Sequence, residues 1–230
     1  MCIETPIVPP ETRFTQKHQL YYEADERGNP ITFKSWLGNA LAPFYDRLME
    51  KMVVPKQLDG DFQKHSEILQ RDLKGFEQQT IIELGTGTGI TAHWLHPSNA
   101  YVGVDISPAL LKRAVKKFRT AGFEHSEFYI LNVERLPFPD SSFDVCLCIL
   151  TLNFFEKAEL VLQQVQRVLE SGGLFYGVVP VPERNTQNRN IEGRLRSEPE
   201  LQKMFTETGF RFTPLEDRNG CLLYFCAEAE

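Results

Sequence analysis

The middle of the chain alternates between short apolar runs and stretches with helical periodicity. Five apolar runs predict β-strands, at residues 81–84, 101–104, 128–131, 143–149 and 174–181. Helical patterns lie between them, at residues 90–95, 108–121 and 157–169. Strands that alternate with helices form a parallel sheet with helices on both faces. The pattern therefore predicts an α/β fold.

The C-terminal residues follow a different pattern. A short helix is predicted from Glu200 to Thr208, where Gly209 ends it. Two apolar stretches then flank Asn219-Gly220, a strong signal for a β-hairpin turn. We therefore expect the sheet to finish with an antiparallel pair of strands.

The N-terminal residues show no such alternation. Residues 1–35 are polar and contain prolines, which predicts an extended arm or cap. Helices are predicted at residues 36–50 and 57–73, and Pro55 is expected to break the pattern between them. We expect residues 1–75 to form an arm and helical cap, and residues 76–230 a ligand-binding domain within the same compact unit.

The stretch "IIELGTGTGI", residues 81–90, ends a predicted strand in three glycines, and Asp105 follows Gly85 by twenty residues. Such a loop lets a ligand approach the backbone, and the helix behind it presents free N–H groups. A carboxylate at the end of the next strand is placed to accept hydrogen bonds from ribose hydroxyls. The plainer alternative is a tight strand-to-helix turn with a surface aspartate.

Two residues separate the classes of nucleotide site that this loop could form. A nicotinamide-binding loop needs glycine or alanine where Ile90 stands. Glu83 lies two residues before the first glycine, where it would repel a pyrophosphate and attract a cationic amino group. A nicotinamide-dependent oxidoreductase is therefore the less favoured alternative.

Four stretches in order, "IIELGTGTGI", "YVGVDIS", "LNVERLPFPDSSFDVCLCILTLNFF" and "QRVLESGGLFYGVVP", resemble the motifs of class I S-adenosylmethionine-dependent methyltransferases. They are most similar to the small-molecule branch that includes the ubiquinone and menaquinone C-methyltransferases. The resemblance implies a Rossmann-like seven-stranded sheet with helices on both faces and a C-terminal antiparallel hairpin. It implies an enzyme that transfers a methyl group from S-adenosylmethionine to a small molecule by in-line displacement, leaving S-adenosylhomocysteine. A protein that binds the cofactor without methyl transfer is the alternative.

The resemblance also implies roles for individual residues. Glu83 and the glycine loop hold the methionine part of the cofactor, Asp105 binds the ribose, and Ile106 packs on the adenine. Asn132 stands where the family commonly has aspartate, and still offers an uncharged acceptor to the adenine. The residues implied to contact the cofactor are Glu83, Gly85, Thr86, Gly87, Thr88, Gly89, Asp105, Ile106, Asn132, Val133, Glu134, Cys148 and Ile149.

The acceptor site is less well specified. Tyr45, in "PFYDRLM", resembles a tyrosine that closes over the cofactor, and is the candidate catalytic residue. Asn153 stands where many relatives have histidine, and Phe154 lines a substrate pocket or belongs to the core. Carbon, oxygen and nitrogen acceptors all stay open, and a thiol is less expected because no cysteine cluster lies outside the strands.

Arginines gather in the loop after the fifth strand. Arg184, Arg189 and Arg194 lie in a polar stretch that would hang over the acceptor site, since ligands bind beyond the carboxyl ends of parallel strands. They predict a mobile lid over residues 182–198 that selects an acceptor with a carboxylate or phosphate. A solvated connecting loop is the alternative.

Composition narrows the class of protein and its location. The net charge of −6 argues against a main affinity for nucleic acid, and no apolar run is long enough to span a membrane. The start lacks the features of a secretory signal, and five cysteines without a paired motif indicate a reduced, cytoplasmic protein. His93 and His96 lack an acidic partner, so no metal site is expected.

Overall fold

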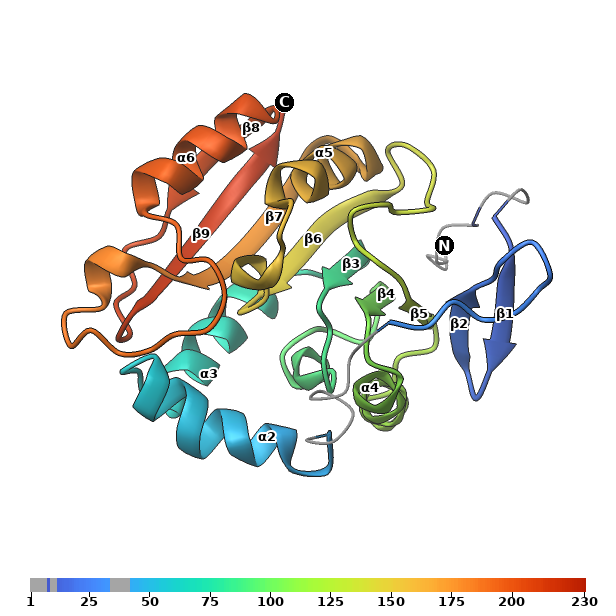
Figure 1. Ribbon diagram of the computed structural model, residues 1–230, viewed down its shortest axis with the longest axis horizontal. Coiled ribbons are helices and arrows are strands. Elements are labelled where there is room, and N and C mark those ends of the chain that lie inside the picture. Colours follow the sequence, from blue (N-terminus) through green and yellow to red (C-terminus); the bar gives the residue numbers. More distant parts are fainter. Residues whose placement is uncertain (1–7, 9–11, 34–41) are drawn as a thin grey trace.

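A mixed β-sheet runs through the computed structural model, which describes residues 8, 12–33 and 42–230 (Figure 1). Among these residues the sheet has nine strands, in the order β1-β2-β5-β4-β3-β6-β7-β9-β8. Their bounds are β1 Phe14–Lys17, β2 Leu20–Glu23, β3 Thr80–Leu84, β4 Ala100–Asp105, β5 Ser126–Ile130, β6 Phe143–Ile149, β7 Leu169–Pro180, β8 Phe210–Pro214 and β9 Leu222–Ala229. Seven neighbouring strands of this sheet, in the order β5-β4-β3-β6-β7-β9-β8, are the seven that the sequence predicts. The predicted fold class is therefore confirmed.

The five central strands are parallel, so their carboxyl ends meet at one edge of the sheet. Strand β3 lies between β4 and β6, and its Ile82 pairs with Val102 on one side and Cys146 on the other. All three of these side chains are buried. The loop that leaves β3 therefore starts at the middle of the sheet, where the strand order reverses, and such switch points are where open α/β sheets bind ligands.

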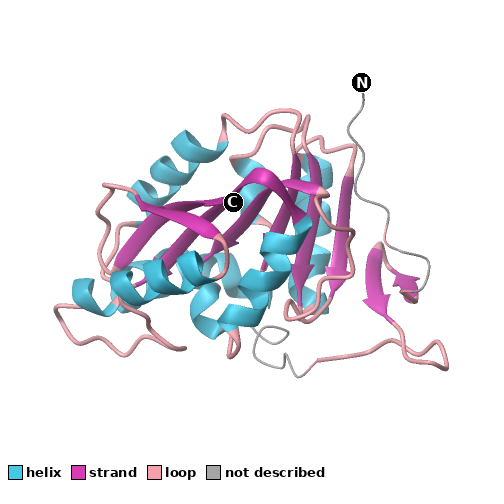
Figure 2. Cartoon of the chain, turned by 90° about the horizontal axis from the view of Figure 1, so that it is seen from above, coloured by secondary structure: helices cyan, strands magenta, loops and turns pink. Residues whose placement is uncertain are grey.

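Helices cover both faces of the sheet (Figure 2). Apolar side chains of α5 and α6 share one core with the sheet, and those of α3 and α4 share the other. The bounds of these helices are α3 Phe62–Leu73, α4 Pro108–Thr120, α5 Ala158–Val168 and α6 Glu198–Glu207. Shorter helical pieces are η1 Ala42–Phe44, α2 Tyr45–Leu48, η2 Met49–Gln57, η3 Ile90–His93, η4 Leu152–Phe154 and η5 Pro182–Arg184.

Strands β1 and β2 extend the sheet beyond the predicted seven. They form an antiparallel hairpin, and β2 runs parallel to β5, where the rings of Tyr21 and Tyr129 stack with centroids 4.8 Å apart. His18 and Gln19 form the turn with φ of 54° and 62°. Because neither is glycine or asparagine, the usual sequence signal for this turn is missing. The expected arm is thus a sheet edge over residues 14–23.

The helical segment formed by α2 and η2 continues through Pro55, so the predicted break at that proline is wrong. Pro55 lies in η2, a π-helical segment that runs to Gln57. The wider π turn leaves room for the proline ring, which would clash with a carbonyl in an α-helix. Residues 36–41 of the predicted helix at 36–50 lie outside the described residues.

Two further expectations change in detail. The helix predicted at residues 90–95 is only the 3₁₀ helix η3, which ends at His93. The C-terminal pair β8–β9 is antiparallel as predicted, but residues 215–221 connect it. The predicted turn at Asn219-Gly220 ends this connection, where the Leu222 N–H donates to the Asn219 carbonyl at 3.1 Å. The Asn219 side-chain amide also bonds to the backbone of Asp61, at 2.7 and 2.9 Å, which ties this connection to the start of α3.

Candidate cofactor site and acceptor cavity

The three glycines after β3 all adopt left-handed backbone, with φ of 72° at Gly85, 57° at Gly87 and 70° at Gly89. They differ in what surrounds them. A Cβ on Gly85 would lie 2.2 Å from Thr151 Cγ2, and a Cβ on Gly89 would lie 2.7 Å from Ala114 Cβ. Both positions are therefore glycine because of close packing. At Gly87 the nearest atom would be a ring carbon of Tyr45, at 3.8 Å, so this glycine faces open space.

Asp105 ends β4 beside this loop. Its Oδ2 accepts a hydrogen bond from the Gly87 N–H at 2.9 Å, and its Oδ1 accepts one from the Ser107 N–H at 2.8 Å. Burial raises the pKa of this carboxyl, while the backbone donors oppose that rise. Ile106, the next residue, leaves 43% of its surface exposed. The carboxylate is thus held at the loop with an exposed apolar side chain next to it.

Glu83 is a buried carboxyl group, only 3% exposed. Its Oε2 accepts hydrogen bonds from Thr91 Oγ1 at 2.7 Å and from the Tyr101 hydroxyl. Burial raises its pKa to about 7, although the two hydroxyl donors act in the opposite direction. Within the described part of the chain, no basic side chain pairs with this carboxyl. A cationic ligand that entered here would supply the missing positive charge.

Asp46 fixes the helical piece α2 to the glycine loop. It accepts hydrogen bonds from the Thr88 hydroxyl and from Lys117 Nζ, the latter at 2.9 Å. Arg113 lies 3.7 Å from the same carboxylate. Tyr45, the preceding residue, is thereby held beside Gly87, and burial, with the charges of Asp105 and Asp46, raises its pKa to about 12.

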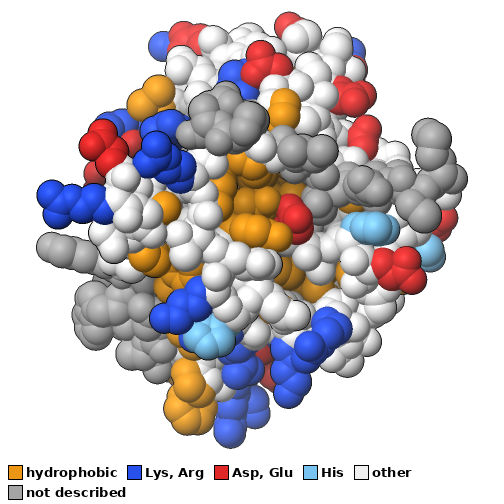
Figure 3. All heavy atoms as spheres, turned by 90° about the vertical axis from the view of Figure 1, so that its right-hand side faces the viewer, with side chains coloured by type: hydrophobic (Ala, Val, Ile, Leu, Met, Phe, Trp, Pro, Cys, Tyr) orange, Lys and Arg blue, Asp and Glu red, His pale blue; other side chains and the backbone are white. Residues whose placement is uncertain are grey.

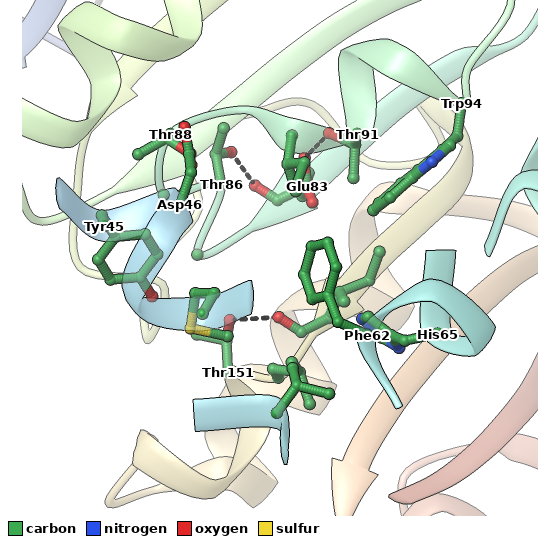
Figure 4. A pocket seen from close by; sticks show the side chains of 17 residues that line it. Tyr45, Asp46, Phe62, His65, Glu83, Thr86, Thr88, Thr91, Trp94 and Thr151 are labelled. Carbon is green, nitrogen blue, oxygen red and sulfur yellow. Dashed lines mark hydrogen bonds between the residues drawn. The ribbon is translucent and has the colours of Figure 1, made fainter. Parts of the chain in front are cut away.

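A cavity lies between the loop, α2 and α3 (Figure 4). Glu83 and Thr91 line one side of it, Tyr45 and Thr88 another, and Phe62 and His65 come from α3. Its lining includes the predicted residues Tyr45, Glu83, Gly85, Thr86, Gly87, Thr88 and Ile149. Gly87 faces open space, and the Glu83 carboxyl has hydroxyl donors but no cationic partner among the described residues. Both features fit an amino-acid ligand such as the methionine part of the expected cofactor.

A second, larger cavity adjoins the first and shares Tyr45, Met49 and Leu150 with it. Most of its lining is apolar, and the residues are Tyr45, Leu48, Met49, Val53, Gln57, Leu58, Leu150, Asn153, Phe154, Pro180, Ile191 and Glu192. Leu150, at the boundary, has a φ of 56°. A branched side chain in this region is strained, and such strain is concentrated at functional sites.

The remaining predicted cofactor residues lie next to the first cavity but do not line it. The Leu131 N–H donates to the Asp105 carbonyl at 3.4 Å, so residues 132–134 begin beside Asp105. Asn132 Oδ1 accepts from the Glu134 N–H at 3.1 Å, and Val133 is buried. Cys148 is a buried thiol in β6.

The predicted acceptor residues divide into two groups. Asn153 and Phe154 line the second cavity, and the buried Asn153 Oδ1 has no hydrogen-bond partner among the described residues. Arg184 donates to the Leu222 carbonyl, and Arg189 pairs with Asp59 at 2.8 Å. The Arg194 side chain is exposed. None of the three arginines is among the described lining of either cavity, so the geometry gives no support to an arginine lid.

Several lining residues carry no signal in the sequence. Phe62 and His65 precede the glycine loop by about twenty residues, on a helix with ordinary amphipathic spacing. His65 is buried, its Nδ1 lies 2.8 Å from the Tyr224 hydroxyl, and burial lowers its pKa to about 4.

In the part of the chain that the structure describes, no group of three or more His, Cys, Asp or Glu residues is placed to hold a metal ion.

Several curated proteins similar to this chain are named as methyltransferases. Residues 82–177 match the family described as methyltransferase domain. A thiol S-methyltransferase of Rattus norvegicus is 35% identical over 46% of this chain, and the match covers 45% of that protein. A demethylmenaquinone methyltransferase of Chlorobaculum parvum is 31% identical over 50% of this chain and 47% of its own length. The chain thus spans about half the length of the curated relatives it matches.

Solved structures share the fold at low sequence identity. The YcgJ protein of Bacillus subtilis aligns with a TM-score of 0.61 over 73% of this chain and 98% of its own, at 16% identity. A methyltransferase of Aquifex aeolicus aligns with a TM-score of 0.61 over 81% of this chain and 97% of its own, at 15% identity. Together with the matched family and its motifs, these likenesses identify the domain. Residues 82–177 match a methyltransferase domain, within a sheet that has the fold of S-adenosylmethionine-dependent methyltransferases.

Proposed function

We propose that this protein transfers a methyl group from S-adenosylmethionine to a small, largely apolar molecule. The observation that carries the proposal is the continuity of two cavities: the one at the glycine loop, and the larger apolar one that shares Tyr45, Met49 and Leu150 with it. Bound at the loop, the cofactor supplies an electrophilic methyl group. The apolar cavity is where the acceptor would reach it.

In this proposal the residues of the loop hold the cofactor. Glu83 binds its ammonium group, Asp105 its ribose hydroxyls, and Ile106 with residues 132–134 its adenine. Because the pKa of Glu83 is about 7 in the free protein, an ammonium partner would favour the ionised form. The cofactor should therefore bind more tightly above pH 7 than below it.

The protein contributes to the reaction by holding the cofactor and the acceptor in position and by excluding water. The raised pKa of Tyr45 keeps its hydroxyl protonated at neutral pH, so it acts as a hydrogen-bond donor and not as a general base. The apolar lining excludes water, and the shared residues hold the two ligands side by side. Residues 1–75 belong to the same functional unit in this proposal, because residues 45–58 line both cavities.

The acceptor is mostly apolar and carries at least one hydrogen-bond donor. The buried Asn153 Oδ1 lacks a partner among the described residues, and a buried acceptor without one is costly. A hydroxyl or amino group on the acceptor would satisfy it. Two relatives are named for sterol and demethylmenaquinone acceptors, which are apolar. The rat relative is named for a thiol, so sulfur joins carbon, oxygen and nitrogen among the atoms to test.

The proposal includes a cytoplasmic location, which the described free thiols Cys146, Cys148, Cys221 and Cys226 support.

The proposed methyl transfer can be tested in two steps. S-adenosylhomocysteine should raise the melting temperature of the protein, and NADH should not. Radiolabelled S-adenosylmethionine should then transfer its label to members of a panel of phenols, quinols, thiols and sterols. Stabilisation by NADH alone would contradict the cofactor, and transfer only to charged acceptors would contradict the acceptor class.

A further inference from the structure

The helix that lines the apolar cavity carries exposed apolar side chains on its outer side. Phe44 is 68% exposed and Met52 is 42% exposed. They lie two helical turns apart, so both project from the same side of the helix, with the half-buried Leu48 between them. Single exposed apolar residues are ordinary on protein surfaces, but a row on one helix side that adjoins a cavity is not.

Basic side chains surround this row although the whole chain is acidic. The segments 42–57 and 106–121 hold eight lysines and arginines but only two acidic residues, against 25 basic and 31 acidic residues in the full sequence. Arg47, Lys51, Lys112 and Lys116 are all exposed. Figure 3 shows lysine and arginine side chains gathered along the lower part of one face, with a hydrophobic side chain protruding beside them.

The two segments form one continuous surface. Asp46 on α2 is 2.9 Å from Lys117 and 3.7 Å from Arg113 on α4. Pro43 and Lys112 line a common shallow depression between η1 and α4. We call the exposed residues Phe44, Arg47, Lys51, Met52, Lys112 and Lys116 the docking face.

We infer that the docking face binds the surface of an anionic lipid bilayer. Apolar side chains enter the boundary between headgroups and acyl chains, and neighbouring lysines and arginines pair with anionic headgroups. The docking face carries both kinds of group side by side. This is attachment to one surface, and none of the described helices has the length and apolar character to cross a bilayer.

The same helix connects the docking face to the proposed acceptor site. Leu48, Met49 and Val53 line the apolar cavity, one turn or less from Phe44 and Met52. An apolar acceptor dissolves better in a bilayer than in water, so docking would bring the cavity to where such an acceptor concentrates. The idea that docking brings the cavity to its acceptor rests on the proposed function. The inferred contact with lipid rests only on the residues of the docking face.

Co-sedimentation with vesicles tests the inference without any methyl transfer. The full chain should sediment with vesicles of mixed phosphatidylcholine and phosphatidylserine, and much less with pure phosphatidylcholine. The double variant Phe44→Ser/Met52→Ser should lower the partition coefficient about tenfold or more, since two buried apolar side chains are lost. Lys51→Glu/Lys112→Glu should lower it at least about fivefold.

Leu160→Ser is the matched control. Leu160 is 40% exposed, nearly as much as Met52, but lies on α5, on the opposite side of the sheet from α2 in Figure 1. The melting temperature of every variant should stay close to that of the wild type. The inference is overturned if the wild type does not sediment with anionic vesicles, or if the Phe44/Met52 variant and the control bind alike. Binding to duplex DNA in place of vesicles would also overturn it, because the basic residues would then serve a nucleic acid.

Discussion

The two cavities of this protein are built in opposite ways. The cofactor cavity takes the polar side chains of Glu83, Thr86 and Thr88 from six consecutive residues, and Asp105 holds this loop from the next strand. Further polar lining comes from Asp46, His65 and Thr151 on other elements. The acceptor cavity draws apolar side chains from three separate parts of the chain, at residues 45–58, 150–154 and 180–192. The first is fixed by hydrogen bonds, and the second is enclosed by packing.

This difference separates recognition of the cofactor from selectivity for the acceptor. Backbone turns and a few carboxylates recognise the charged and polar parts of a cofactor, and they need close local geometry. An apolar cavity discriminates mainly by shape, so its residues can change without disturbing the loop. Substitutions at the cofactor end should therefore abolish binding, whereas those around the acceptor cavity should shift preference.

The largest expected effect is at Gly87. Gly87→Val should abolish S-adenosylhomocysteine binding in calorimetry while the sheet stays folded, because the new side chain points into open space that the ligand needs. Gly89→Val should instead lower the free energy of unfolding by about 2–3 kcal/mol beyond the backbone strain, since its Cβ meets α4. Both positions have similar positive φ, so strain alone would affect them equally. A Gly87→Val protein that binds normally would contradict the assignment.

Glu83→Gln should change stability in a pH-dependent way. The pKa of Glu83 is about 7 in the folded protein against an ordinary value of 4.5, so its contribution to stability is complete below about pH 4.5 and is lost as the pH rises through 7. In the free protein at pH 8, the variant should therefore be more stable than the wild type by about 3 kcal/mol. Urea unfolding at pH 5 and pH 8 measures this. A variant equally destabilised at both values would show that the carboxylate has a partner when ionised.

Asp105→Ala should weaken S-adenosylhomocysteine binding by about 1.5–3 kcal/mol for each ribose bond lost, which calorimetry would measure. The variant also removes the acceptor of the Gly87 N–H. Asp105→Asn is the control, because it keeps one uncharged acceptor and should lose less. Equal affinity for wild type and both variants would contradict the ribose assignment.

The smallest expected effect is at Arg189, whose partner Asp59 lies just outside the acceptor cavity. The pair is partly exposed, at 29% and 35%, so Arg189→Ala should cost less than about 1 kcal/mol of stability. The affinity for S-adenosylhomocysteine and the KM for apolar acceptors should not change. A raised KM confined to acceptors with a carboxylate or phosphate would favour the arginine lid over the apolar cavity.

The residues of the cofactor cavity can be predicted from the sequence because the motifs that mark them are local. The glycine loop, Glu83 and Asp105 lie within 23 residues, and most of the seven main strands contain a short apolar run. The acceptor cavity is assembled from distant segments, such as those that hold Met49 and Leu150, and no local pattern predicts that they come together. The arginines at 184 and 189 illustrate the limit: their charge is plain in the sequence, but their partners Leu222 and Asp59 are not.

The fold shows the same division. The hairpin at residues 14–23 was missed because its turn residues, His18 and Gln19, lack the glycine or asparagine that usually marks such a turn. Pro55 was expected to break a helix because the rule for α-helices does not cover a π-helical segment. In both cases tertiary packing sets a backbone conformation that the residues alone do not favour.

One measurement tests the central claim, that the cofactor is held at the glycine loop with its reactive end toward the apolar cavity. S-adenosylmethionine labelled with ¹³C at the transferable methyl can be bound to the protein, and its nuclear Overhauser contacts recorded. We predict contacts with Met49 and Leu150, which both cavities share. Contacts confined to Trp94 and His65, which line only the first cavity, would contradict the claim.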